Sequence, residues 1–199
     1  MHLNIAFSGP AGSGINTAWE LLSELLAKKW YHVRMDKEYA SVIKWNNNTM
    51  FVNISDDNKP YFSKKIQLFI ALDRLALEKN YEIFNLEEII ELSHENTSRK
   101  NTFAFWIAVE KLNLSHEEAE NMLKEKWFLE KDREWNLKAL DEWIEYWKQN
   151  WWMIADLSNN IGSPLSMHFG NSLIADGAAK AWLEFYSAYP MTPASSIIN

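Results

Sequence analysis

Short apolar runs separated by helical and polar stretches mark residues 1–90 of the chain. Four such runs predict strands, at residues 3–7, 31–35, 50–54 and 66–72. Between the first two, apolar residues recur at i, i+3, i+4, i+7 and i+8 from Ala18 to Leu26, which is the pattern of one buried helix face. The run at 66–72 is almost continuous, as in a central parallel strand buried on both faces, and Asp73 follows it. Strands that alternate with helices in this way predict an α/β domain, with its sites at the carboxyl ends of the strands.

The pattern becomes helical after about residue 85. Two capping-box pairs predict helix starts, Asn85 with Glu88 and Ser115 with Glu118. Further helices are predicted at residues 101–112 and 136–150. The first domain is therefore predicted to span residues 1–150 and to have a helical C-terminal half.

The remaining residues predict a linker and the beginning of a second domain. Residues 151–169 hold a Gly-Ser-Pro turn and few charges, which is typical of a linker. Residues 170–199 begin with a small-residue helix, expected at 172–185, and end in a proline-rich loop. Because about thirty residues cannot bury a core of their own, we expect them to be an N-terminal fragment of a larger domain.

A glycine-dense turn holding Gly9, Gly12 and Gly14 joins the first predicted strand to the first predicted helix. Glycine permits positive φ and close approach of a ligand, and a helix N-terminus offers free N–H groups to an anion. The spacing of Gly9 and Gly14 fits the first half of a phosphate-binding P-loop, but Ile15 and Asn16 occupy the positions of its Lys and Ser or Thr. The spacing is also not that of a dinucleotide fingerprint. A tight turn without a ligand and a weakened phosphate site both remain open.

The composition of the chain indicates which partners, which compartment and which metal sites can be expected. The net charge of -7 and the lack of a long basic run argue against nucleic acid. No apolar run approaches ~20 residues and no signal peptide is recognisable, so a cytoplasmic protein without a membrane segment is predicted. The chain has no cysteine, hence no disulfide, thiolate metal site or iron–sulfur cluster of its own. Its five histidines show no ligand spacing, and no catalytic triad or paired carboxylates can be assigned.

Motifs in both halves of the chain resemble one enzyme family. The N-terminal motifs are Phe7-Ser8-Gly9-Pro10-Ala11-Gly12-Ser13-Gly14 with Thr17-Ala18, Ser41-x-Ile43-Lys44 with Asn47-Asn48-Thr49, Val52-x-Ile54-Ser55-Asp56, and Ile70-Ala71-Leu72-Asp73. They resemble the gamma-type domain of 2-oxoacid:acceptor (ferredoxin) oxidoreductases. The C-terminal motifs are Gly170-Asn171 and Tyr186-x-Ala188-Tyr189-Pro190-Met191-Thr192-Pro193-Ala194-Ser195-Ser196. They resemble the start of the thiamine-pyrimidine-binding domain, and this domain order is similar to the alpha subunit of 2-oxoglutarate-type members.

The resemblance implies a fold, a reaction and a set of partners. It implies a Rossmann-like gamma domain with a mostly parallel sheet, followed by a truncated βα start of the thiamine-binding domain. The reaction would be oxidative decarboxylation of a 2-oxoacid, 2-oxoglutarate or pyruvate, to an acyl-CoA with reduction of ferredoxin. Thiamine diphosphate with Mg²⁺ would be shared with a beta subunit, which would also carry the iron–sulfur cluster, and coenzyme A would be the co-substrate.

The resemblance also suggests site residues. Thr192 is the candidate contact to substrate or thiamine, with Tyr189 and Pro190 shaping its loop, while the Gly9–Gly14 turn would lie near coenzyme A or a subunit interface. The family's thiamine-activating glutamate would lie beyond residue 199, so this polypeptide is not expected to be active alone. Two alternatives stay open: a nucleotide-binding module with a degenerate P-loop, and a non-catalytic interaction protein that keeps the gamma fold.

The balance of glycine and tryptophan is abnormal. The chain has 6 glycines and 11 tryptophans in 199 residues, whereas glycine ordinarily makes up ~7%. By the family pattern, six tryptophans occupy positions where glycine is usual: Trp19, Trp30, Trp45, Trp106, Trp143 and Trp182. We hypothesise that these are UGA codons that the source organism translates as glycine; the alternative is a genuinely tryptophan-rich variant. Several of these side chains should then be exposed or awkwardly packed, with the Trp19 ring crowding the glycine turn.

Overall fold

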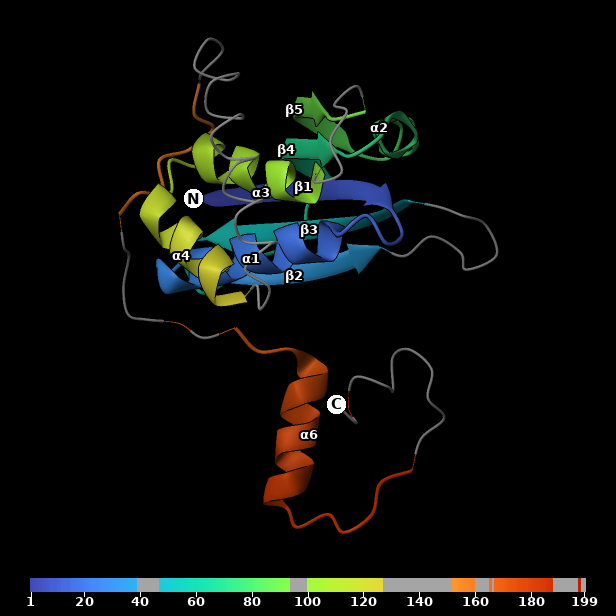
Figure 1. Cartoon of the computed structure of the whole chain (residues 1–199), viewed down its shortest axis with the longest axis vertical. Coiled ribbons are helices and arrows are strands. Elements are labelled where there is room, and N and C mark those ends of the chain that lie inside the picture. The colour runs from blue at the N-terminus through green and yellow to red at the C-terminus, as the bar shows by residue number, and fades with distance from the viewer. Residues whose placement is uncertain are drawn as a thin grey trace. The chain divides into compact units, whose positions relative to one another are not determined.

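The computed structural model describes residues 1–38, 47–93, 100–126, 152–159, 165, 167–187 and 197. The chain divides into two compact units, Met1–Leu165 and Ser166–Asn199. The first unit contains β1 (His2–Pro10), α1 (Ile15–Lys28), β2 (His32–Glu38), β3 (Asn47–Ser55), β4 (Lys65–Ala71), α2 (Arg74–Tyr81), β5 (Asn85–Glu91), α3 (Lys100–Lys111) and α4 (His116–Lys126) (Figure 1). The second unit contains α6 (Gly170–Lys180).

The strands of the first unit form one sheet in the order β2-β3-β1-β4-β5. β4 runs parallel to both β1 and β5, whereas β3 runs antiparallel to both β1 and β2. Among the described strands, four therefore point in one direction and β3 opposes them, which confirms the α/β class and makes the sheet mixed. The reversal has a simple cause, because the eight residues between β2 and β3 are too few for the crossover that a parallel neighbour requires.

Each face of the sheet carries its own apolar cluster. The larger one lies under α1, α3 and α4 (Figure 1) and includes fully buried Leu22 and Leu25 of α1 and Phe105 of α3. The smaller one lies on the other face, where Phe51 and Phe84 share a cluster with Ala76 of α2. The apolar stripe predicted for the first helix is thus its buried face, and α1 and α2 cover opposite faces of the sheet.

The prediction of a helix starting at Asn85 is wrong, because Asn85–Glu91 forms strand β5. The Asn85 N–H donates to the Lys64 carbonyl at 2.8 Å, and Lys65 of β4 forms an ion pair with Glu87 of β5 at 2.7 Å. The capping-box spacing is a local preference, and pairing with the parallel β4 overrides it.

The other local helix predictions agree with the described structure. The helix predicted at 101–112 is α3 (Lys100–Lys111), and the Glu118 N–H donates to Ser115 Oγ at 3.3 Å at the start of α4. Residues 100–111 and 116–126 are therefore helical, as expected, whereas residues 85–91 of the half that was predicted to be helical form β5. The helix predicted at 136–150 lies outside the described residues.

Residues 152–159 belong to the first unit and are held to the rest of it by two buried lysines. Lys111 donates from Nζ to the Trp152 carbonyl at 3.2 Å, and Lys29 donates from Nζ to the Ser158 carbonyl at 3.2 Å. Leu157 is part of the larger apolar cluster. The division into units falls after Leu165, and the predicted limits of the linker stay a prediction.

The second unit is described mainly through α6, which begins two residues before the predicted 172–185 and ends at Lys180. None of its side chains is buried, and Leu173 and Ile174 are more than half exposed. In the part of the chain that the structure describes, no helix has the length and apolar character needed to cross a membrane.

Candidate functional site

The carboxyl ends of β1 and β4 form the point where the strand order reverses. From β1 the chain continues to β2 on one side of the sheet, and from β4 it continues to β5 on the other. The Leu72 N–H donates to the Ser8 carbonyl at 2.8 Å, so the two strand ends are held together. In open α/β sheets the crevice outside such a reversal is the usual ligand site.

The glycine turn lies at this crevice, between β1 and α1. The Ser13 N–H donates to the Pro10 carbonyl at 3.0 Å, with Gly12 at φ 84° inside the turn. Gly14, at φ 79°, is the N-cap of α1, and no side chain caps the helix there. The first N–H groups of α1 therefore lack a side-chain acceptor, which is the arrangement that favours an anion.

Packing explains two of the three glycines without a ligand. A Cβ atom on Gly9 would lie 2.9 Å from Leu72 Cβ, and one on Gly14 would lie 2.6 Å from Asn101 Nδ2. Gly12 is different, because its φ favours glycine while a Cβ atom there would meet nothing within 4 Å. The turn is thus closed on its sheet side and open above Gly12.

The position of the P-loop lysine is occupied by Ile15, which is buried in the larger apolar cluster, but a cation reaches the crevice from elsewhere. Lys100, the first residue of α3, donates from Nζ to the Leu72 and Ser93 carbonyls, both at 3.3 Å. These are its two acceptors among the described residues, and a lysine ammonium has three N–H donors in all. No sequence pattern singles out Lys100, because only the fold brings α3 to the ends of β4 and β5.

A fully buried polar network lies behind the turn. Ser8 Oγ is 3.0 Å from Thr49 Oγ1, Asn80 Nδ2 donates to Ser8 Oγ at 3.1 Å, and Thr49 Oγ1 donates to Asn80 Oδ1 at 3.1 Å. The network joins β1, β3 and α2, and a satisfied buried network of this kind makes the end of β1 rigid. No sequence pattern predicts this network either, because isolated Ser, Thr and Asn residues have no distinctive spacing.

Asp73 lies two residues after the end of β4, and it directly follows the strand predicted at 66–72. Its Oδ1 accepts from Asn47 Nδ2 and from the Ala76 N–H, both at 2.7 Å, so it is the N-cap of α2. Lys79 donates from Nζ to the Asn47 carbonyl at 3.3 Å. The carboxylate therefore stabilises the start of α2 and the neighbouring β3.

The three residues predicted around thiamine, Tyr189, Pro190 and Thr192, lie outside the described residues. The structure therefore neither brings them together with the glycine turn nor separates them from it. Within the described ranges, no group of three or more His, Asp or Glu side chains could hold a metal ion.

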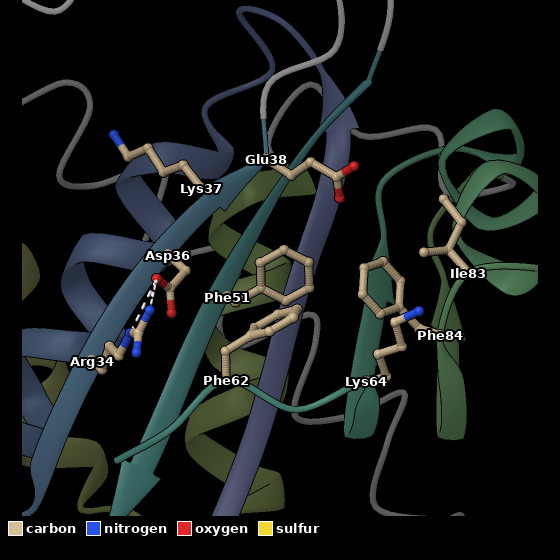
Figure 2. A pocket seen from close by; sticks show the side chains of 9 residues that line it. All are labelled: Arg34, Asp36, Lys37, Glu38, Phe51, Phe62, Lys64, Ile83 and Phe84. Atoms are coloured by element: carbon tan, nitrogen blue, oxygen red, sulfur yellow. Dashed lines mark hydrogen bonds and ion pairs between the residues drawn. The ribbon is translucent and has the colours of Figure 1, made fainter. Parts of the chain in front are cut away.

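A pocket of about 370 Å³ opens on the sheet face that carries the smaller cluster (Figure 2). Its lining residues are Arg34, Asp36, Lys37, Glu38, Phe51, Phe62, Lys64, Ile83 and Phe84. The Phe51 ring lies edge-on to Phe62 at 5.0 Å and is tilted against Phe84 at 5.2 Å. Asp36 accepts from Arg34 at 2.9 Å, so this charge pair is satisfied within the rim. Three of its nine lining residues are phenylalanines and five are charged, and the pocket was not predicted from sequence.

Trp19 does not crowd the turn as expected. It is 2% exposed, and its Nε1 donates to the Phe51 carbonyl at 2.8 Å. Lys37 Nζ lies 4.4 Å from the centre of its ring. The indole therefore packs between α1 and the sheet and is well accommodated there.

A stretch within the N-terminal half of the chain matches a known family model. Residues 4–90 match the family model described as pyruvate ferredoxin/flavodoxin oxidoreductase. This confirms the resemblance drawn from the sequence motifs of that region. A comparison with curated proteins finds no match.

Several solved structures share the fold. The 2-oxoglutarate:ferredoxin oxidoreductase of Magnetococcus marinus, with 2-oxoglutarate, coenzyme A and succinyl-CoA bound, aligns over 99% of this chain with a TM-score of 0.76 and 22% identity. The alignment covers 40% of that protein's chain. Two further structures each align over 72% of this chain and 96% of their own with a TM-score of 0.51: the pyruvate oxidoreductase subunit PORC of Thermotoga maritima, at 16% identity, and the gamma subunit of a keto/oxoacid ferredoxin oxidoreductase of Geobacter sulfurreducens, at 18%.

Proposed function

With residues 4–90 matching the pyruvate ferredoxin/flavodoxin oxidoreductase family, we propose that the chain is an alpha-subunit segment of a 2-oxoacid:ferredoxin oxidoreductase. The proposed reaction is oxidative decarboxylation of 2-oxoglutarate or pyruvate to an acyl-CoA, with reduction of ferredoxin. The assignment to an alpha subunit rests on the share of this chain that each solved structure covers. The two gamma-type subunits account for 72% of this chain, whereas one chain of the Magnetococcus enzyme accounts for 99%.

The second unit is proposed to be the start of the thiamine-pyrimidine-binding domain. Its α6 buries no side chain of its own, and the alignment covers 40% of the longer Magnetococcus chain. Bound thiamine diphosphate with Mg²⁺ would supply the decarboxylation chemistry at the boundary with a beta subunit, whose iron–sulfur cluster would deliver electrons to ferredoxin. Thr192, with Tyr189 and Pro190, is the proposed contact from this chain. A cytoplasmic location is part of the same proposal.

The glycine turn is proposed to bind the phosphate groups of coenzyme A. The uncapped N-terminus of α1 offers N–H donors, Gly12 leaves room above them, and Lys100 supplies a positive charge at the same crevice. Charge-assisted hydrogen bonds to phosphate are stronger than neutral ones. Coenzyme A in the Magnetococcus structure supports this choice of anion.

The test uses the complex of this subunit with its beta subunit and compares two lysine variants. Lys100→Gln should raise the KM for coenzyme A about tenfold, since a charged hydrogen bond contributes ~1.5–3 kcal/mol, and should leave the KM for the 2-oxoacid unchanged. Lys100→Arg should restore most of the affinity. Lys79→Gln is the matched control, because Lys79 lies at the same edge of the sheet but bonds only Asn47 among described residues.

Failure of the coenzyme A site and failure of the function give different results. An unchanged KM for coenzyme A in Lys100→Gln would remove the site and leave the enzyme assignment standing. A chain that recovers no thiamine-diphosphate-binding partner, and a complex that reduces no ferredoxin with either 2-oxoacid, would remove the function itself.

Two other functions remain to be separated from it. A degenerate P-loop module would bind ATP, and the buried Ile15 in place of the phosphate-binding lysine argues against this. An interaction protein that keeps the gamma fold is favoured by one observation, the aromatic pocket around Phe51 and Phe62, whose apolar floor suits an inserted side chain. Calorimetry with ATP tests the first, and a stable complex without any 2-oxoacid turnover would support the second.

The recoding of UGA as glycine is also a proposal. Composition and family pattern raised it for the chain as a whole.

A further inference from the structure

Helix α1 ends in a Schellman motif closed by Trp30. The Trp30 N–H donates to the Ala27 carbonyl at 2.9 Å, and the Tyr31 N–H donates to the Leu26 carbonyl at 3.0 Å. These are the two reversed hydrogen bonds of the motif, which requires a left-handed residue immediately after the C-cap. Trp30 is that residue, with φ 70°.

Helix α6 ends in the same way at Trp182. The Trp182 N–H donates to the Ala179 carbonyl at 3.1 Å, and the Leu183 N–H donates to the Ala178 carbonyl at 3.0 Å. Trp182 has φ 59°. The two units thus contain the same motif with the same unusual residue.

A third helix provides the ordinary case. At the end of α3, Asn113 has φ 50°, its N–H donates to the Glu110 carbonyl at 2.9 Å, and the Leu114 N–H donates to the Val109 carbonyl at 2.9 Å. Among the described residues, Trp30, Asn113 and Trp182 are the non-glycine residues with positive φ. Asparagine is the residue that replaces glycine most readily at this position.

The backbone at such a position disfavours tryptophan. In the left-handed region the Cβ of an L-residue crowds the following carbonyl oxygen, which costs ~1–2 kcal/mol, and only Gly and to a lesser degree Asn or Asp avoid this. Packing does not compensate at Trp182, whose side chain is 90% exposed. Two of three equivalent positions therefore hold a residue that the backbone disfavours.

We infer that the natural polypeptide has glycine at positions 30 and 182, where UGA codons are translated as glycine. The inference rests on backbone geometry and holds whatever the overall composition is. It is narrower than the six-residue hypothesis, because Trp19 and Trp106 lie within α1 and α3, where φ does not favour glycine. Trp106 is fully buried and its Nε1 has no hydrogen-bond acceptor among the described residues, which marks it as awkwardly packed but not as a glycine position.

Trp152 is the internal control. Its Nε1 donates to Glu88 Oε2 at 3.2 Å, and Lys111 Nζ lies 4.4 Å from the centre of its ring. Both the indole N–H and the aromatic face are therefore used, as in a cation–π contact that a smaller residue cannot make. This position is expected to be tryptophan in the natural protein.

The test is peptide mass spectrometry of the protein purified from its natural source, together with the codons of its gene. The expected result is glycine at 30 and 182 with UGA codons, and tryptophan at 152 with a UGG codon. Tryptophan in the natural peptide at either 30 or 182, or UGG at either codon, would overturn the inference. Glycine at 152 would overturn it too. It would mean that a tryptophan whose N–H and ring both make contacts can still stand at a recoded position.

Discussion

The ends of α1 and α3 have the same backbone and opposite side-chain chemistry. At α3, Asn113 Nδ2 donates to Asp156 Oδ1 at 3.0 Å. The Ser158 hydroxyl first, then the Ser158 N–H and Asn113, lower the pKa of that carboxyl. At α1, Trp30 closes an identical motif that favours glycine. The hydrogen bonds of the motif therefore determine the backbone conformation of the helix end. The identity of the left-handed residue determines only how much free energy this conformation costs.

The largest expected effect comes from giving the end of α3 the tryptophan that closes α1. Asn113→Trp should lower the free energy of unfolding by ~2 kcal/mol, because it adds the left-handed cost of a bulky side chain and removes the bond to Asp156. Chemical denaturation of the first unit measures it. Asn113→Gly is the control and should stay within ~0.5 kcal/mol of the parent, since glycine accepts this φ and loses only the one bond. Equal stability of the Trp and parent proteins would show that the left-handed residue does not determine the cost.

The reverse change at α1 should be stabilising. Trp30→Gly should raise the free energy of unfolding by ~1 kcal/mol, the relief of the left-handed strain reduced by the greater freedom of glycine in the unfolded chain. Trp30→Ala separates backbone from ring, because it removes the indole but keeps a Cβ at φ 70°. A gain for Ala as large as that for Gly would assign the strain to the ring and break the comparison.

Helix ends also show what the sequence could predict of the fold. Patterns that are local and repeated were sufficient, as in the apolar stripe of α1 and the Ser115 cap of α4. The capping-box pair at Asn85 misled, because residues 85–91 are held by the parallel neighbour β4, which no local pattern reveals. The early end of α6 was missed for a related reason, since Trp182 is not a residue that predicts a left-handed helix end.

The candidate site divides in the same way. The glycine turn and Asp73 were found because each directly follows a recognisable strand. Lys100 and Asn80 were not, because they reach the crevice from α3 and α2, whose placement depends on the order of strands in the sheet. The sequence therefore located the carboxyl ends of the strands. The fold added the positive charge of Lys100 and the buried network that includes Asn80.

A smaller effect is expected at α6. Trp182→Gly should stabilise the helix end by ~0.5–1 kcal/mol, since the ring is almost wholly exposed and only the backbone term changes. Amide hydrogen exchange of residues 178–183 should show slower exchange in the glycine variant. Trp182→Asn should lie between the two, because asparagine tolerates the left-handed region better than tryptophan does. Faster exchange in Trp182→Gly would mean that the ring protects the helix end after all.

The smallest expected effect is a pH dependence of stability at the end of α3 that is absent at the end of α1. A hydrogen bond from His116 Nε2 to Glu110 Oε1, 2.6 Å long, raises the pKa of His116 above its ordinary value of 6.5, with burial opposing. Because the folded pKa is the higher one, this stabilisation of the α3–α4 junction is fully present below pH ~6.5 and is lost as the pH rises through the raised pKa. This stabilisation should be slight, since the imidazole is nearly half exposed.

The free energies of unfolding of the parent and of His116→Gln, measured from pH 5 to 8, should differ most at the acidic end. The gain in stability from Trp30→Gly should not change over the same range, because backbone strain does not titrate. A gain at Trp30 that follows the His116 titration would mean that the two helix ends are coupled, and the comparison between them would then describe one structural unit and not two.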